Sequence, residues 1–388
     1  MQILTLVFLL ASALCCHAAD TLSRLKASHF IEFNIRPSYV MPTHPIYKGY
    51  NESGKAIRFS GSAHLQYGFR FSPDSNFGEL FPTAYQGIGV GGQSFFRHSE
   101  IGTPLALYIF QGADIAHLAP NLSLGYEWNF GLSFGWHENS AVRSALNAYI
   151  NAGLLMSWQI TPYLTLTAGP EYTHFSNGDT TFPNAGANTV GMRLGVRGNI
   201  HGEGVRKAQN RKNDEYEKEL CSKPFKERIA YDLTIFGAWR AARDIVDRSL
   251  YIINKPFPIA GLNFNPLYRI DRHFSVGAAL DFNYDGSANL YGHVVDKDTK
   301  TVSSYLTPSF REQISAGASV RGELTMPIFS VNIGAGCNFY MKGEDMKRFY
   351  TIFNLKAFLT DRLFLLIGYR LSSLQYTHNL MFGIGWRL

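Results

Sequence analysis

Hydrophobic and polar residues alternate along most of this chain in segments of about ten residues. Side chains of a β-strand point alternately to its two faces, so each segment predicts a strand with one apolar and one polar face. The predicted strands form two sets of eight, near 29–40, 61–72, 83–94, 104–113, 120–135, 147–159, 163–176 and 188–200, and near 228–241, 257–269, 273–284, 310–324, 328–341, 347–359, 362–372 and 378–388.

The length of the predicted strands is compatible with a protein that crosses a membrane by strands. About ten residues is what a tilted strand needs to cross a bilayer, and no later stretch reaches the roughly 18 apolar residues of a membrane helix. Residues 1–19 read as a secretory signal peptide, a short apolar run closed by small residues. An exported chain of this kind is a soluble all-β protein or an antiparallel transmembrane β-barrel in the outer membrane of a Gram-negative bacterium.

The two sets of strands are predicted to be repeats. The segment ITPYLTLTAG at 160–169 corresponds to LTDRLFLLIG at 359–368, and the mixed-charge stretch 201–227 between the halves reads as a periplasmic linker. Residues 27–200 and 228–388 are the predicted halves. They are expected to merge into one barrel of about 16 strands; the alternative is two tandem eight-stranded barrels.

Composition narrows the range of partners. The net charge of +6 is scattered over strands and loops, which argues against a nucleic-acid partner and suits weak attraction to anionic lipid headgroups. The 12 histidines show no metal-ligand spacing, so no metal site is expected. Of the four cysteines, only Cys221 and Cys337 remain after signal cleavage, which indicates no disulfide framework.

Reactive side chains meet at the end of one strand pair. Parity puts His174 and Ser176 on the apolar face of the strand 163–176, and Asn188 returns to that face across the loop 177–187. A base beside a hydroxyl, with a third group to orient the base, is what acyl transfer requires. On a membrane barrel the apolar face meets lipid, so this trio predicts hydrolysis of a lipid ester.

The same stretch resembles a known motif. HFSNGDTTFPNAGAN at 174–188 is similar to that of the PagL-type lipid A 3-O-deacylases, outer-membrane enzymes with an eight-stranded barrel. In that family His-x-Ser-Asn is followed by Pro-Asn-x-Gly and by an orienting Glu twelve residues after the Ser. The resemblance covers about residues 27–200.

The resemblance implies a role for each matched residue. Ser176 would be the nucleophile, His174 the general base and acid, and Asn188 would orient the imidazole in place of the family's Glu, without its negative charge. The residues around the oxyanion and in its supporting loop would be Asn177, Gly178, Asp179 and Asn184. The implied partner is lipid A or lipopolysaccharide of the outer leaflet, the loop would be extracellular, and no cofactor is needed.

The second half is predicted to lack this chemistry, because Ser373 stands where the first half has His174. Two other functions remain open from the sequence: a non-catalytic barrel such as a porin or structural protein, and another lipid esterase or phospholipase.

Overall fold

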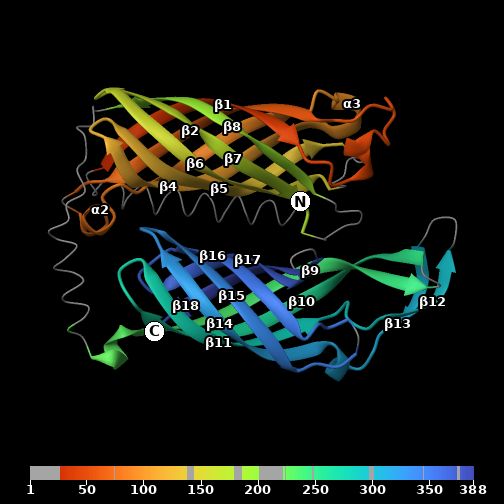
Figure 1. Cartoon of the computed structure of the whole chain (residues 1–388). Coiled ribbons are helices and arrows are strands. Elements are labelled where there is room, and N and C mark those ends of the chain that lie inside the picture. Colours follow the sequence, from red (N-terminus) through yellow and green to blue (C-terminus); the bar gives the residue numbers. More distant parts are fainter. Residues whose placement is uncertain are drawn as a thin grey trace. The chain divides into compact units, whose positions relative to one another are not determined.

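The computed structural model describes residues 27–73, 75–137, 144–178, 186–200, 222, 224–246, 249–296, 301–343, 345–373 and 376–388. The predicted signal peptide, 1–19, and most of the predicted linker, 201–227, lie outside these residues. The chain divides into two compact units, one built on strands β1–β8 and the other on β9–β18 (Figure 1).

The first unit is a closed, antiparallel, eight-stranded barrel. Its strands are β1 (Ala27–Val40), β2 (Phe59–Phe71), β3 (Tyr85–Ser94), β4 (Gly102–Ala119), β5 (Leu122–Trp136), β6 (Leu146–Thr161), β7 (Leu164–Ser176) and β8 (Ala187–Asn199). β8 pairs back onto β1, from Phe30 opposite Asn199 to Val40 opposite Thr189. The expectation of one 16-stranded barrel is therefore wrong, and the alternative of two tandem barrels is confirmed.

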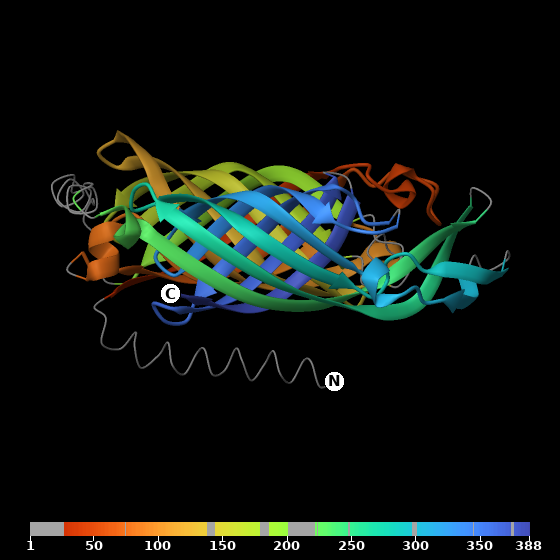
Figure 2. The ribbon, with the colours of Figure 1, turned by 90° about the horizontal axis from the view of Figure 1, so that it is seen from below.

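The second unit closes in the same way through β10 and β11. Its barrel strands are β9 (Ile229–Val246), β10 (Ser249–Arg269), β11 (Phe274–Asp285), β14 (Ile314–Thr325), β15 (Phe329–Tyr340), β16 (Phe349–Phe358), β17 (Leu363–Ser373) and β18 (Tyr376–Arg387). A further hairpin, β12 (Tyr291–Asp296) and β13 (Thr301–Leu306), adds to the far end of β10. The strands run obliquely around each barrel (Figure 2), as closure of a small barrel requires.

Helices are confined to short connecting segments. They are η1 (Pro45–Lys48), α2 (Asn76–Leu80), α3 (His98–Ile101), η2 (Phe225–Arg228) and η3 (Phe310–Glu312). Among the residues that the structure describes, none of these helices has the length and apolar character to cross a membrane.

Burial along the strands is reversed relative to a water-soluble protein. In β1 the apolar side chains Ile31 and Phe33 are 49% and 54% exposed, whereas Glu32 and Asn34 are fully buried. Apolar side chains point outward and polar ones line the lumen, which is the arrangement of a barrel surrounded by lipid. The polar lumen accommodates inward charges such as Glu32, which is paired there with Arg193 and Arg197.

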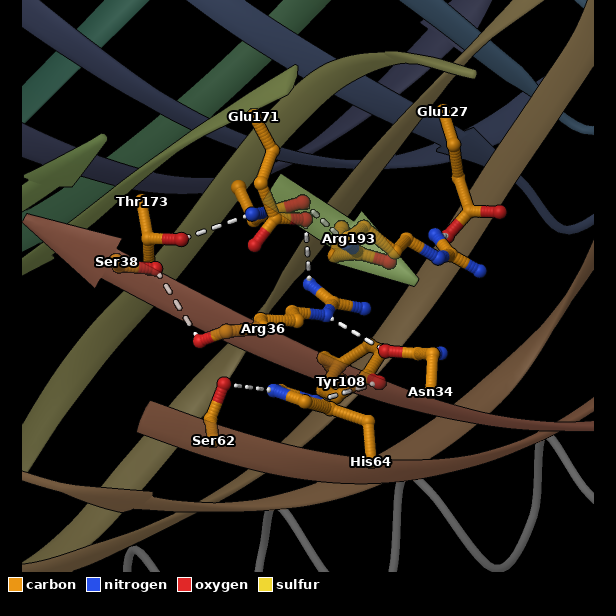
Figure 3. Close-up of polar contacts among 12 residues, drawn as sticks. Asn34, Arg36, Ser38, Ser62, His64, Tyr108, Glu127, Glu171, Thr173 and Arg193 are labelled. Atoms are coloured by element: carbon orange, nitrogen blue, oxygen red, sulfur yellow. Dashed lines mark hydrogen bonds and ion pairs between the residues drawn. The ribbon is translucent and has the colours of Figure 1, made fainter. Parts of the chain in front are cut away.

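Ion pairs hold the lumen of the first barrel together. Arg193 lies between Glu32 and Glu127 and contacts both carboxylates. Nearer the site end of the barrel, Arg36 pairs with Glu171 at 3.2 Å (Figure 3). Buried ion pairs cost desolvation energy, which further hydrogen bonds offset, as those from Arg36 to Asn34 and from Arg193 to Gln66 do here.

Figure 3 also shows a histidine in this lumen. His64 Nδ1 lies 3.0 Å from Tyr108 Oη, and His64 Nε2 lies 2.9 Å from Ser62 Oγ. All three side chains belong to the inward-facing polar set, so this group fills the lumen together with the ion pairs.

The second barrel repeats the design with different residues. Lys356 contacts Asp232 at 2.6 Å and also Glu323, and Arg387 bridges the same two carboxylates at 2.7 and 2.6 Å. Each barrel thus has a cluster of paired cations and carboxylates in its lumen. The repeat extends from the strand pattern to the electrostatics of the interior.

Candidate active site at the rim of the first barrel

The end of β7 and the start of β8 bring two of the predicted residues directly opposite each other. His174 pairs with Asn188 in the β7–β8 ladder. Between His174 and Ser176, Phe175 points into the lumen, where its ring packs on Trp136 at 5.0 Å and on Tyr149 at 5.3 Å. Because neighbouring side chains alternate, this inward anchor directs His174 and Ser176 to the outer face.

The contact between His174 and Asn188 determines which imidazole nitrogen carries the proton. His174 Nδ1 lies 2.7 Å from Asn188 Oδ1. An amide oxygen only accepts hydrogen bonds, so the proton is on Nδ1 and the lone pair is on Nε2. This is the tautomer in which a histidine serves as general base towards a serine.

Two further residues hold Asn188, and the sequence analysis gave them no role. Tyr172 Oη donates a hydrogen bond to Asn188 Oδ1 at 2.6 Å. Asn188 Nδ2 donates to Thr43 Oγ1 at 3.3 Å. Tyr172 shares the face of His174, so strand parity could have pointed to it, but Thr43 comes from the connection after β1 and no local pattern signals it.

Gly186, the glycine of the Pro-Asn-x-Gly motif, lies against the imidazole. Its φ of +67° is in the left-handed region. A Cβ at this position would be 3.1 Å from both His174 Cε1 and the carbonyl oxygen of Phe175. The site therefore requires a residue without a side chain here, both for the backbone conformation and for the space beside His174.

Gly186→Ala is expected to lower the activity of the site by about tenfold, since the new methyl group must displace His174 or strain the backbone by ~1–3 kcal/mol. The measurement is fatty acid release from vesicles that contain lipid A, the substrate implied by the sequence resemblance. Gly198→Ala is the matched control, because a Cβ there meets nothing closer than a carbonyl oxygen at 3.9 Å. Equal activities of the two variants would contradict the role assigned to Gly186.

The remaining predicted site residues fall into two groups. Asn177 and Gly178 follow Ser176 directly, and Gly178 has a left-handed φ of +66°. Asp179 and Asn184 lie outside the described residues. Within the part of the chain that is described, no group of three His, Cys, Asp or Glu side chains is placed to hold a metal ion.

In the second barrel the connection between β17 and β18 is much shorter than this loop. Ser373 ends β17, and only residues 374 and 375 separate it from β18. In the first barrel residues 177–186 make the same connection between β7 and β8. The segment that would carry an equivalent of the motif is therefore absent from the β17–β18 connection.

Comparison with models of known protein families shows to which family the chain belongs. Residues 64–197 match the family model of lipid A 3-O-deacylase (PagL), and residues 229–388 match the model of the acyloxyacyl hydrolase C-terminal domain. Together the two ranges span about three quarters of the 388 residues. The chain belongs to the PagL family. The first match includes His174, Ser176 and Asn188, and the PagL family is one of outer-membrane barrels.

Solved structures similar to this PagL-family chain are distant. Neisserial surface protein A is 14% identical and covers 45% of this chain and 99% of its own, with a TM-score of 0.30. The siderophore receptor PirA from Acinetobacter baumannii is 7% identical and covers 89% of this chain and 68% of its own, with a TM-score of 0.25. At these values neither likeness bears on function. No curated protein matches the chain.

Proposed function

We propose that this protein is an outer-membrane deacylase that hydrolyses an ester-linked acyl chain of lipid A through Ser176, His174 and Asn188. The observation that carries the proposal is the 2.7 Å contact of His174 Nδ1 with Asn188 Oδ1, which leaves Nε2 free of its proton. The PagL match over residues 64–197 supports the substrate class.

In the proposed mechanism His174 Nε2 takes the proton from Ser176 Oγ as that oxygen attacks the ester carbonyl carbon. The tetrahedral intermediate collapses, His174 protonates the departing alkoxide of the sugar, and an acyl-enzyme remains on Ser176. Water, deprotonated by His174, then releases the fatty acid. Backbone N–H groups after Ser176, at Asn177 and Gly178, are the proposed donors to the oxyanion.

The position of the site suits a lipid substrate. His174 and Asn188 lie at the end of the barrel opposite to Ala27 and Asn199, because β7 runs parallel to β1 in an antiparallel barrel of eight strands. In bacterial barrels the chain ends face the periplasm. We therefore place the site at the outer leaflet, where lipopolysaccharide resides.

A porin is the less favoured alternative. At the level of Glu32 the lumen of the first barrel is occupied by interlocked side chains, among them Arg193 and Gln66, which bond to each other at 2.7 Å. A water-filled channel needs an open lumen, and eight-stranded barrels enclose little more than their own side chains. A barrel filled with hydrogen-bonded polar groups favours a function on its outer surface.

Mass spectrometry of lipid A from cells with and without the protein tests the proposal. We expect a species lighter by one acyl chain, with the corresponding free fatty acid, only in cells that contain the protein. Lysophospholipids with unchanged lipid A would identify a phospholipase instead. Unchanged lipids of both kinds would overturn the proposal in favour of a non-catalytic barrel.

A further inference from the structure

An amide in the orienting position creates a problem that a carboxylate does not have. Both oxygens of a carboxylate accept hydrogen bonds, so either one can hold the Nδ1 proton of His174. The amide of Asn188 has one acceptor and one donor end. If it turned by 180°, its NH₂ group would face His174, the imidazole would have to accept on Nδ1, and the proton would move to Nε2.

That reversed arrangement would disable the proposed mechanism. With its proton on Nε2, His174 cannot take the proton of Ser176, and the wrong histidine tautomer costs a serine-protease triad about 10⁴ in kcat. The free-energy difference between the two amide orientations therefore sets the fraction of enzyme that is competent. Contacts at both ends of the amide determine this difference.

The structure supplies one contact for each end. At the oxygen end Asn188 Oδ1 accepts from Tyr172 Oη at 2.6 Å in addition to His174. At the nitrogen end Asn188 Nδ2 donates to Thr43 Oγ1 at 3.3 Å. If the amide turned, the two hydroxyls would have to exchange roles, with Thr43 Oγ1 donating to the amide oxygen and Tyr172 Oη accepting from the NH₂ group. A phenol is a stronger donor and a weaker acceptor than an aliphatic alcohol, so the observed orientation is the one of lower free energy.

The backbone holds Tyr172, Asn188 and Thr43 close together. Tyr172 precedes His174 by two residues on the same face of β7. The nitrogen of Met41 donates to the carbonyl oxygen of Asn188 at 2.9 Å, and the nitrogen of Thr43 donates to that of Met41 at 2.8 Å. Thr43 is thereby held beside the amide by the same segment that continues β1.

We propose that Tyr172 and Thr43 are positioning residues that orient the amide of Asn188, so that its oxygen faces His174. The proposal rests on the proposed function for its catalytic consequence, but the orientation itself can be observed without catalysis. It explains how a site with an asymmetric group in the orienting position keeps a single histidine tautomer.

A comparison in two backgrounds tests the proposal. Tyr172→Phe and Thr43→Val each remove one hydrogen bond and are expected to lower deacylase activity by about tenfold in the parent chain. In the Asn188→Asp background the same changes are expected to cost less than about twofold, because a carboxylate accepts through either oxygen. Tyr163→Phe, at the β6–β7 turn, is the control and should leave activity unchanged in both backgrounds.

Equal losses in the Asn and Asp backgrounds would overturn the proposal, since the two residues would then support the fold and not the orientation of the amide. The activity of the double variant Tyr172→Phe/Thr43→Val, compared with the activities of the two single variants, is a second measure. Orientation control predicts that the double variant loses at least as much activity as the product of the single losses, because no contact then selects the oxygen end.

A spectroscopic readout separates this proposal from the proposed function. ¹⁵N spectra of histidine-labelled protein in micelles, with His174 identified by its absence in His174→Gln, report which ring nitrogen carries the proton. We expect an Nδ1–H tautomer in the parent and an increased Nε2–H population in the double variant. An unchanged tautomer would refute the amide orientation, whereas a shifted tautomer in a protein without deacylase activity would refute only the proposed function.

Discussion

Ser176→Ala is expected to abolish deacylation of lipid A while the barrel still folds and reaches the membrane. Without the hydroxyl no acyl-enzyme can form, and removal of a nucleophilic serine has cost about 10⁶ in kcat in a serine protease. We expect a loss of at least about 10³, because water can replace the serine as nucleophile only inefficiently. Ser176 is the last residue of β7, and the alanine variant keeps its backbone, so we expect the barrel to form normally.

The measurement is the rate of fatty acid release from lipid A in vesicles that contain purified protein. Ser157→Ala is the matched control and should retain activity, because Ser157 lies in the half of β6 distant from Ser176. The folded state of each variant is checked by its faster migration in unheated detergent gels. Retained activity in a folded Ser176→Ala protein would refute the serine mechanism.

Arg193→Leu is expected to destabilise the first barrel by about 3–5 kcal/mol. Arg193 is 3% exposed and contacts Glu32, Glu127 and the side-chain oxygen of Gln66. Removing one member of a buried ion pair leaves the other charge without compensation, which costs more than the pair itself contributes. Here Glu127 loses its ion pair with Arg193, whereas Glu32 keeps Arg197 at 2.8 Å.

Urea unfolding in micelles, followed by tryptophan fluorescence, gives the free energy of unfolding. Adding Glu127→Gln to Arg193→Leu should recover part of the loss, because one uncompensated charge is removed. Met192→Leu, a neighbouring change on the exposed outer face, should stay within about 0.5 kcal/mol of the parent. A similar stability of Arg193→Leu and Met192→Leu would show that the ion pairs contribute little.

The strand pattern was predictable from the sequence, but the closure of the sheet was not. Apolar residues alternate outward in the same way in a barrel of eight strands and in one of 16, so periodicity holds no information on which edges pair. The pairing of β8 with β1 decides this point. The hairpin β12–β13 was missed because its two strands of six residues flank the polar stretch KDTK at 297–300, which reads as loop.

The candidate site was predictable only as far as local spacing reaches. Strand parity and the loop length brought His174 and Asn188 together, and the structure pairs them directly. The residue at the other end of the amide, Thr43, lies 145 positions away in the sequence. Contacts of this kind arise from closure of the barrel, so a pattern read along one segment cannot reveal them.

Under the proposed function, the outward position of His174 and Asn188 predicts how the reaction rate depends on the membrane. A substrate that approaches this face diffuses in the plane of the bilayer, and the enzyme responds to the number of target lipids per unit of membrane area. Diluting lipid A with inert lipid would then slow the reaction even when the amount of lipid A in the sample is constant. For the proposed enzyme the membrane would be the reaction medium, and the surface density of lipid A would take the place of its bulk concentration.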